Sequence, residues 1–451
     1  MPEPIISVSG LRGIVGESLT PDVAARYVAA FADALPEGPI VVGRDGRTTG
    51  PMLALAVQSS LAAMGREVLY ADVAATPTLG VLVRAKKAAG GVQITASHNP
   101  PPYNGLKLFS GEGRILTAAA GQPVLERYRS GGARWAKFDR LGKTERLSDS
   151  TSDHLRLLSS IVDINQIARR RFRVLLDSNA GSGSILGRKL LENLGCDVVA
   201  IGDQPNGQFL HPPEPTAANL QSIGQKVLER GAVIGFCQDP DADRLALIDE
   251  RGQYIGEEYT LALCVDQVLS HHRGPVVTNC ATSRMTLDLA SKYGVPYSRS
   301  AVGEANVVDE MLRQKAVFGG EGSGGPIDPR VGFVRDSFVG MALVLAGLAE
   351  RGESLSQWVA RLPKYEIHKV TLQLDSRQLP AAFDAVQKRF AEATADRLDG
   401  LRLDWPDRWL IVRGSNTEPI VRVIAEAPTL DLARQLCDQT SQVLQSLSAA
   451  R

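Results

Sequence analysis

The stretch ITASHNPPPYNGLK, from residue 94 to residue 107, combines a serine with residues that hold a chain rigid. Val92 and Ile94 have the pattern of a buried strand, and the three prolines at 100–102 can neither continue a helix nor donate to a sheet ladder. We therefore expect Ser97 on a stiff loop at the end of a strand, where a nucleophile or a phosphate carrier would be presented. An ordinary Ser/Asn/Pro turn has the same spacing and stays open at this point.

A serine hydrolase is the competing chemistry for this serine, and two features of the sequence argue against it. The stretch has no G-x-S-x-G elbow. His98 is the immediate neighbour of Ser97, and neighbouring side chains point to opposite sides of an extended chain. We therefore expect His98 to point away from the Ser97 hydroxyl.

The second chemical pattern is a run of three carboxylates, Asp239, Asp241 and Asp243. Their spacing of two residues puts all three on one side of an extended chain, and hard oxygen donors of this kind suit Mg²⁺. An EF-hand also begins D-x-D-x-D, but its sixth position here is Arg244 instead of glycine, and the following residues 245–248 have the pattern of a strand. A solvated acidic turn is the other alternative.

Two glycine-rich stretches remain. Residues 179–184 partly match a dinucleotide-binding loop, but the third glycine and an acidic partner about 20 residues further on are missing, so a tight strand-to-helix turn is enough to explain them. Residues 319–325 read GGEGSGG, and they include Glu321 and Ser323. A plain glycine-rich turn is one interpretation of that second stretch.

Length and composition restrict the class of protein. At about 100–200 residues per domain, 451 residues predict three or four domains. Fifty basic residues balance fifty acidic ones, which gives no indication of a nucleic-acid or membrane surface. The five cysteines are scattered without a C-x-x-C pair, and no secretion signal or membrane-length apolar run is evident. We expect a soluble cytoplasmic protein with reduced thiols.

Strand and helix patterns alternate over most of the chain, which predicts parallel sheets with right-handed crossovers. We divide the chain into residues 1–150 with the Ser97 loop, 151–251 with the aspartate loop, 252–366 with the Glu321 loop, and 367–451. The first three units each end a strand in a polar loop that contains glycine, which suggests a repeated architecture without a repeat in the sequence. The last unit, with an alternating strand, a helix over 379–393, paired strands and a long helix, predicts a small α+β domain.

The stretch TASHNPPPYNGLKLF resembles the active-site loop of the α-D-phosphohexomutases, the family of phosphoglucomutase, phosphomannomutase and phosphoglucosamine mutase, and the resemblance spans the whole chain. It implies an α/β fold of three similar mixed α/β-sandwich domains plus a smaller C-terminal α+β domain around one cleft. It also implies that Ser97 is phosphorylated, and that the three aspartates bind Mg²⁺ with a phosphoserine oxygen as a further ligand.

The resemblance implies roles for further residues. Lys107 and Arg12 are candidates for general acid/base catalysis or for stabilising the developing charge, Arg244 would neutralise a phosphate or sugar group, and His98 would support the loop. Glu321 and Ser323 would bind ring hydroxyls. The non-reacting phosphate would be held by an arginine fork, hydroxyls, an amide and backbone N–H groups, at Arg413, Ser415, Asn416, Thr417 and Arg422.

Three positions depart from the pattern that many relatives share. Ser9 stands where an aspartate is common, and Gly325 stands where a histidine is often found. Asn416 replaces a glycine, which the loop can tolerate because asparagine accepts left-handed backbone angles better than most residues.

The sequence therefore predicts a phosphohexomutase that interconverts hexose 6-phosphate and hexose 1-phosphate through phosphorylated Ser97 and a hexose 1,6-bisphosphate intermediate. Phosphoglucosamine mutase is the favoured activity, and phosphomannomutase or phosphoglucomutase is the alternative. A magnesium-dependent phosphatase and a non-catalytic sugar-phosphate-binding protein are the rivals. The expected partner is a small sugar phosphate, with neither nucleic acid nor membrane, and the chain is expected to be a monomer or a homodimer.

Overall fold

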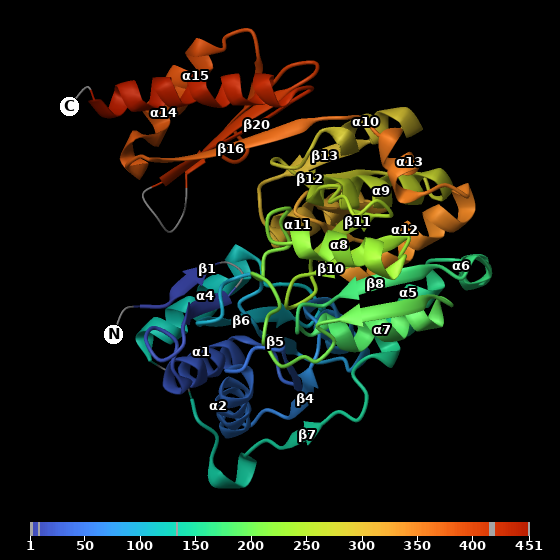
Figure 1. Ribbon diagram of the computed structural model, residues 1–451. Coiled ribbons are helices and arrows are strands. Elements are labelled where there is room, and N and C mark those ends of the chain that lie inside the picture. Colours follow the sequence, from blue (N-terminus) through green and yellow to red (C-terminus); the bar gives the residue numbers. More distant parts are fainter. Residues whose placement is uncertain (1–2, 8–9, 132–133, 415–419, 450–451) are drawn as a thin grey trace.

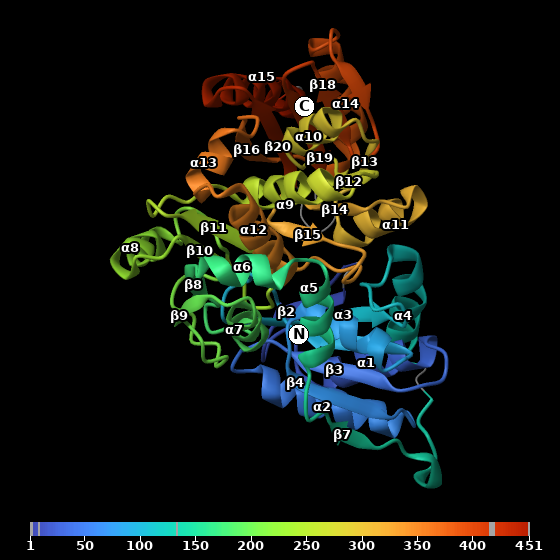
Figure 2. The same cartoon turned by 90° about the vertical axis from the view of Figure 1, so that its right-hand side faces the viewer.

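The computed structural model describes residues 3–7, 10–131, 134–414 and 420–449, which form four sheets with their helices. Figures 1 and 2 show the four parts in succession, with the fourth beside the third and farthest from the first. Among the helices of these residues, none has both the length and the apolar character needed to cross a membrane.

The first three sheets are built on one repeated unit of strand, helix, strand, helix, strand, strand. In the first sheet the unit consists of β3 (Ile40–Arg44), α2 (Gly50–Ala63), β4 (Val68–Val73), α3 (Thr76–Ala85), β5 (Gly90–Ile94) and β6 (Tyr103–Ser110). In the second it consists of β8 (Arg173–Asp177), α7 (Gly183–Asn193), β9 (Asp197–Ile201), α8 (Gln221–Arg230), β10 (Ile234–Gln238) and β11 (Leu245–Asp249). In the third it consists of β12 (Val276–Asn279), α10 (Met285–Tyr293), β13 (Tyr297–Ser300), α11 (Glu304–Gln314), β14 (Phe318–Glu321) and β15 (Gly325–Ile327).

The pairing of strands is the same in all three units. The first strand lies between the second and the third and is parallel to both, and the fourth strand is antiparallel to the third. The sheets are therefore mixed, where the alternation of strands and helices alone predicted parallel ones. The reason is that the third and fourth strands follow each other through a short loop, and a short connection joins antiparallel neighbours.

The remaining elements extend these units or join them. The first sheet also contains β1 (Ile5–Ser7), β2 (Gly10–Ile14) and β7 (Thr144–Arg146), with the order β1-β2-β6-β5-β3-β4-β7. The helical elements outside the repeated units are α1 (Pro21–Ala34), α4 (Ala118–Ser130), η1 (Phe138–Arg140), α5 (Ser152–Ser160), α6 (Ile164–Arg170), α9 (Glu257–His271), α12 (Ser337–Arg351) and α13 (Leu355–Ala360).

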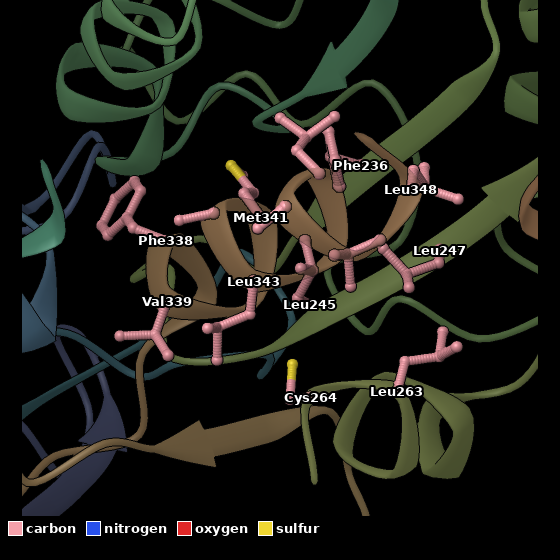
Figure 3. Packing of buried hydrophobic residues seen from close by; sticks show 14 of the residues in the cluster. Phe236, Leu245, Leu247, Leu263, Cys264, Phe338, Val339, Met341, Leu343 and Leu348 are labelled. Carbon is pink, nitrogen blue, oxygen red and sulfur yellow. The ribbon is translucent and has the colours of Figure 1, made fainter. Parts of the chain in front are cut away.

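The second and third sheets share one hydrophobic core, because α9 and α12 pack between them. Figure 3 shows Leu343 and Leu348 of α12 close to Leu245 and Leu247 of β11, with Leu263 and Cys264 of α9 below them in the view. α12 is apolar around almost its whole circumference and is buried accordingly. These two units are therefore expected to behave as one folded body.

A buried histidine joins the first unit to this shared core. His154 of α5 contacts Thr78 of α3 through Nδ1 at 3.0 Å and Asp336 through Nε2 at 2.8 Å. Asp336 also caps the first turn of α12 by accepting from the backbone N–H groups of Phe338 and Val339. The His154 side chain thus connects three elements that are far apart in the sequence, namely α3, α5 and the start of α12.

The fourth sheet has a different plan. Its elements are β16 (Glu366–Gln373), η2 (Ser376–Gln378), α14 (Leu379–Arg389), β17 (Thr394–Asp396), β18 (Leu401–Asp404), β19 (Trp409–Gly414), β20 (Ile420–Ala427) and α15 (Leu430–Ala449). The order is β16-β20-β19-β18-β17, all pairs are antiparallel, and α14 and α15 cover one face (Figure 1). α14 ends four residues before the expected 393, because Phe390 turns into the core and Thr394–Asp396 pairs with β18.

Replacing Trp358 of α13 by alanine tests the shared core. Its ring is buried, and its Nε1–H donates to Asp266 Oδ2 at 2.9 Å. Trp358→Ala leaves a cavity and removes one of the donors to Asp266, which keeps Arg351 and Lys292 as ionic partners. We expect the free energy of unfolding to fall by about 3–5 kcal/mol, mainly through the cavity. Urea denaturation followed by circular dichroism measures this. Leu228→Ala on α8, at an exposed position, is the control and is expected to change stability by less than about 0.5 kcal/mol. Equal losses in the two variants would contradict this account of the core.

Candidate active site

The three stretches that the sequence singled out occupy the same position in the repeated unit. Each one connects the third strand to the antiparallel fourth strand: residues 95–102 between β5 and β6, residues 239–244 between β10 and β11, and residues 322–324 between β14 and β15. They meet in space. Ser97 Oγ lies 3.0 Å from Asp239 Oδ2, and Arg335, which precedes α12, contacts both Asp243 and Glu321.

Ser97 is buried and has a left-handed backbone, with φ of +49°. This conformation costs a residue with a side chain on the order of 1–2 kcal/mol, so the surroundings must hold it. Thr95 Oγ1 accepts a hydrogen bond from the Ser97 N–H at 2.9 Å. Because the chain is not extended here, the expectation for His98 is wrong: its Nδ1 lies 3.2 Å from Ser97 Oγ.

The histidine does not form a hydrolase-like triad with Ser97. Burial, and after it the charges of Arg244 and Arg12, lower the pKa of His98 to about 3, so the imidazole is neutral near pH 7. No carboxylate among the described residues hydrogen-bonds to His98. The neutral imidazole therefore contacts the serine without a carboxylate partner from the described part of the chain, and its supporting role stays a prediction.

The buried side chain of Arg47 holds the serine loop through hydrogen bonds to its backbone. Its Nη2 donates to the carbonyl oxygens of Ser97 at 2.7 Å and Asn99 at 2.6 Å, and its Nη1 donates to those of Pro100 and Tyr103 at 3.0 Å each. Asp45 pairs with the Nε of the same guanidinium at 3.2 Å. One buried cation thus satisfies four carbonyl groups that no ladder or helix uses, which fixes the path of the loop.

The carboxylates of Asp239, Asp241 and Asp243 form a fully buried cluster, with one oxygen of each within 4.8 Å of the others. Burial, and after it the negative charges of Asp243 and Asp241, raise the pKa of Asp239 well above its usual range. Asp241 Oδ1 and Asp243 Oδ1 are buried and accept no hydrogen bond from the part of the chain that the structure describes. Hard oxygen atoms in this state are suited to coordinate a small divalent cation such as Mg²⁺.

The other oxygens of this cluster bind cationic and hydroxyl donors. Lys107 Nζ, on β6, donates to Asp241 Oδ2 at 2.7 Å and to Asp243 Oδ2 at 2.8 Å. Thr76, at the start of α3, donates to Asp241 Oδ2 at 2.5 Å. Burial alone would lower the pKa of Lys107, but Asp241 and Asp243 outweigh that effect and raise it above its usual value. Both oxygens of Asp239 thus accept hydrogen bonds, whereas Asp241 and Asp243 each have one oxygen that accepts none from the described residues.

A cavity of about 220 Å³ opens next to Ser97. Its charged and polar lining residues are Arg12, Ser97, His98, Lys107, Arg244, Glu304, Asn306, Glu321 and Arg335. Arg12 is held by Asn99 Oδ1 at 2.6 Å, while the backbone N–H of Arg244 donates to Asp239 Oδ1 at 3.1 Å. A cavity with four lysine or arginine side chains in its wall is suited to a phosphorylated ligand.

Glu321 is oriented from both sides. Its Oε1 accepts from Asn279 Nδ2 at 2.8 Å and from the backbone N–H of Gly303 at 3.1 Å, and its Oε2 accepts from Arg335 Nη1 at 2.7 Å. Ser323 lies two residues further along the same turn, half-buried, and is not among the described residues that line the cavity. The structure therefore brings Glu321, but not Ser323, to the cavity wall.

The fourth sheet brings Arg413 and Arg422 together as a directly opposed pair on β19 and β20. Arg413 Nη2 lies 3.0 Å from Asp399 Oδ2, and Asp399 Oδ2 also accepts from the backbone N–H of Val302, which lines the cavity. The predicted phosphate-binding residues Ser415, Asn416 and Thr417 lie outside the described residues, as does Ser9.

Family models match the chain in four segments. The models of phosphoglucomutase/phosphomannomutase alpha/beta/alpha domains I, II and III match residues 5–134, 152–252 and 257–365, and the model of the C-terminal domain matches residues 370–443. The chain belongs to the phosphoglucomutase/phosphomannomutase family. It is thus a phosphohexomutase by family, with four domains that correspond to the four sheets.

Individual relatives match over the full length. A phosphoglucomutase/phosphomannomutase of Thermococcus kodakarensis is 35% identical over 446 residues, which cover 97% of each chain. A probable phosphoglucosamine mutase of Methanopyrus kandleri is 33% identical over 96% of this chain and 95% of that one. The crystal structure of a phosphoglucomutase/phosphomannomutase family protein from Burkholderia thailandensis has a TM-score of 0.85 at 26% identity and covers 98% of each chain.

Sequence reasoning did not identify Arg47, Glu304 or Arg335 in this phosphohexomutase. Arg47 follows β3 in the turn GRDGR, and its position directly after a buried strand is a weak signal that could have drawn attention to it. Glu304 and Arg335 carry no such signal, because each lies outside the three loops and reaches the cavity only through the docking of α11 and the segment before α12.

Asp241→Asn tests the metal site. The substitution removes a negative charge while keeping the shape of the side chain, so we expect the dissociation constant for Mg²⁺ to rise at least tenfold. Isothermal titration calorimetry on the protein without sugar measures the affinity directly. Asp203→Asn, on a half-exposed loop of the second unit, is the control and is expected to bind Mg²⁺ as the wild type does. Unchanged affinity in Asp241→Asn would contradict a metal site at this cluster.

Arg47→Met tests whether the clamp positions Ser97. Because small misplacements of a reacting group are costly, we expect kcat to fall at least tenfold while KM changes less than threefold. Arg66→Met is a matched control, since Arg66 also binds four carbonyl oxygens, at the end of α1 and away from the cavity. We expect the control to lose thermal stability without losing kcat. Equal kcat in the two variants, each corrected for folded fraction, would contradict a positioning role.

Proposed function

We propose that this chain interconverts hexose 6-phosphate and hexose 1-phosphate through phosphorylated Ser97 and a hexose 1,6-bisphosphate, with glucosamine phosphate as the favoured substrate. The observation that carries the proposal is the position of Ser97 Oγ, 3.0 Å from Asp239 Oδ2 at the wall of a cavity lined by Arg12, Lys107 and Arg244. A serine hydroxyl between a carboxylate cluster and several cations suits phosphoryl transfer, which depends mainly on positioning and charge neutralisation.

The reaction would consist of two phosphoryl transfers. In the first, a sugar hydroxyl attacks the phosphorus on Ser97, the bond from phosphorus to Ser97 Oγ breaks, and Ser97 Oγ takes up the proton that the sugar hydroxyl loses. The sugar bisphosphate then turns over within the site. In the second, Ser97 Oγ attacks the phosphorus of the other phosphate, and the bond from that phosphorus to the sugar oxygen breaks. The sugar oxygen takes up the proton that the Ser97 hydroxyl loses. Atoms and charges balance over the cycle, and the enzyme returns to its phosphorylated form.

Each group of residues has a distinct part in this proposal. Asp239, Asp241 and Asp243 would hold Mg²⁺, which supplies positive charge next to the transferring phosphoryl group. Lys107 and Arg12 are the candidates for handling the hydroxyl proton or stabilising the developing charge, and Lys107 is held by the two aspartates at the wall of the cavity. Arg244 would neutralise phosphate oxygens, and the neutral His98 would steady the serine through its contact at 3.2 Å.

Recognition of the sugar is proposed for two other places. Glu321 would bind ring hydroxyls, since its carboxylate is held at the cavity wall by Asn279, Gly303 and Arg335. Ser323 would assist from the same turn. Arg413 and Arg422 of the fourth sheet, with Ser415, Asn416 and Thr417, would bind the phosphate that does not react. Because either end of the bisphosphate must occupy that second site, it has to recognise phosphate and not the sugar.

The choice of glucosamine phosphate is supported by relatives named as probable phosphoglucosamine mutases, such as the 33% identical protein of Methanopyrus kandleri. Mannose and glucose phosphates are the alternatives, in line with the name of the 35% identical Thermococcus kodakarensis protein.

Phosphorus NMR with Mg²⁺ and a trace of hexose 1,6-bisphosphate tests the proposal. Glucosamine, mannose and glucose 6-phosphate are supplied in turn, and we expect a 1-phosphate signal to appear fastest with glucosamine 6-phosphate. Free phosphate without a 1-phosphate would identify a phosphatase instead. Binding without any turnover, in protein that is phosphorylated and loaded with metal, would identify a sugar-phosphate-binding protein.

Ser97→Ala tests the carrier. The variant lacks the hydroxyl that accepts the phosphoryl group, so we expect at least a thousandfold loss of turnover and no transfer of radioactive phosphate to the protein. Circular dichroism is expected to show an intact fold. Ser130→Ala, at the exposed end of α4, is the control and is expected to keep full activity. Turnover close to normal in Ser97→Ala would refute the assignment.

A further inference from the structure

The glycine at position 325 leaves room for a side chain from another part of the chain. A Cβ atom at Gly325 would lie 2.5 Å from Cδ, 2.9 Å from Cγ and 3.1 Å from Cβ of Arg335. Gly325 is the first residue of β15, and its backbone is not in the left-handed region, so space is the reason for glycine here. Any larger residue at 325 would displace the aliphatic part of Arg335.

Arg335 uses this space to reach the wall of the active-site cavity. Its Nη2 donates to Asp243 Oδ2 at 2.6 Å, and its Nη1 donates to Glu321 Oε2 at 2.7 Å. Glu304 supports it from behind, with Oε2 3.3 Å from Nε and Oε1 accepting from the Arg335 backbone N–H at 3.0 Å. The guanidinium is thus fixed by three carboxylates, and it lines the cavity beside Ser97 and Lys107.

The two carboxylates that accept hydrogen bonds from Nη1 and Nη2 of this guanidinium belong to different sheets. Asp243 is in the loop between β10 and β11, and Glu321 is at the end of β14 in the third sheet. Both carboxylates are buried, and a buried carboxylate that loses its partner is destabilised strongly. Among the described residues, Arg335 is the only cationic side chain that bonds to Glu321, whereas Asp243 also has Lys107. The orientation of Glu321 therefore depends on Arg335 more than that of Asp243 does.

We propose that Arg335 is a positioning residue for sugar recognition, which ties Glu321 to the aspartate loop, and that Gly325 is the residue that permits it. The inference rests on the proposed function in one respect, namely that Glu321 binds the ring hydroxyls of a hexose phosphate. It assigns a role to the departure at position 325: the space that a side chain would fill there is occupied by Arg335. Arg335 and Gly325 therefore act as one unit, and a change at either position has the same consequence.

Binding and kinetics of Arg335→Met and Gly325→Ala test the proposal. Calorimetry gives the dissociation constant for the preferred hexose 6-phosphate, and steady-state assays separate KM from kcat. We expect both variants to raise the dissociation constant and KM at least tenfold, because Glu321 loses its ionic partner in either case. Arg335→Lys, which keeps the charge but not the fork, is expected to recover part of the loss.

The double variant decides whether the two positions act together. If Gly325→Ala acts by displacing Arg335, it adds no further loss in the Arg335→Met background, so we expect the double variant to match Arg335→Met within twofold. Effects that multiply would overturn the link between the two residues. A dissociation constant and KM within twofold of the wild type in Arg335→Met, whatever its thermal stability, would overturn the positioning role.

Two controls separate these outcomes from general damage and from failure of the proposed function. Arg330→Met removes a nearby arginine whose side chain pairs with Asp328 outside the cavity, and Gly121→Ala adds a methyl group in α4 where nothing lies within 4 Å. Both are expected to keep the wild-type dissociation constant and KM. If the wild-type protein itself neither binds nor converts a hexose phosphate, the proposed function fails. If the wild type does both and Arg335→Met does so equally well, only the inference about Arg335 fails.

Discussion

Burial of three aspartates in one cluster is the constraint that the rest of the site meets. Asp239, Asp241 and Asp243 are fully removed from solvent, and like charges at this separation are tolerated only with opposite charge beside them. Lys107 supplies that charge from the first sheet and Arg335 supplies it from the segment before α12. The site is therefore complete only when the first three units are docked, and the same ion pairs that neutralise the cluster hold those units in register.

The repeated unit explains why residues so far apart in the sequence meet. In each of the three sheets the functional candidates lie where the third strand passes into the antiparallel fourth strand: Ser97 and the aspartates are in the connecting loops, and Glu321 is the last residue of β14. The three loops then need only to face one another. The fourth sheet has another plan, and Asp399 links its Arg413 to the backbone of Val302 at the cavity.

Local strain at Ser97 shows how positioning is achieved. The residue has a left-handed backbone that it would rarely adopt alone, and it is held there by Thr95 on its N–H and by Arg47 on its carbonyl. Arg47 lies 50 positions earlier in the chain, at the end of a neighbouring strand. A stiff proline-rich loop thus receives its final shape from a cation that the loop itself does not contain, and the Ser97 hydroxyl faces Asp239 as a result.

The sequence by itself determined the four-part organisation, the alternation of strands and helices, and the three stretches with Ser97, the aspartates and Glu321, because these depend on local patterns of apolar, proline and glycine residues. Only the tertiary structure decided that the fourth strand of each unit pairs antiparallel with the third, since strand pairing depends on chain segments that no local pattern relates. One of these fourth strands, β6, places Lys107 in contact with the aspartates. It also decided that His98 turns toward Ser97 and that Arg47 and Arg335 belong to the site. An isolated arginine has the same appearance in a sequence whether it lies at the surface or is buried and binds four carbonyl oxygens of one loop. Only the packing of distant segments, with the requirement that every buried charge find a partner, tells the two apart.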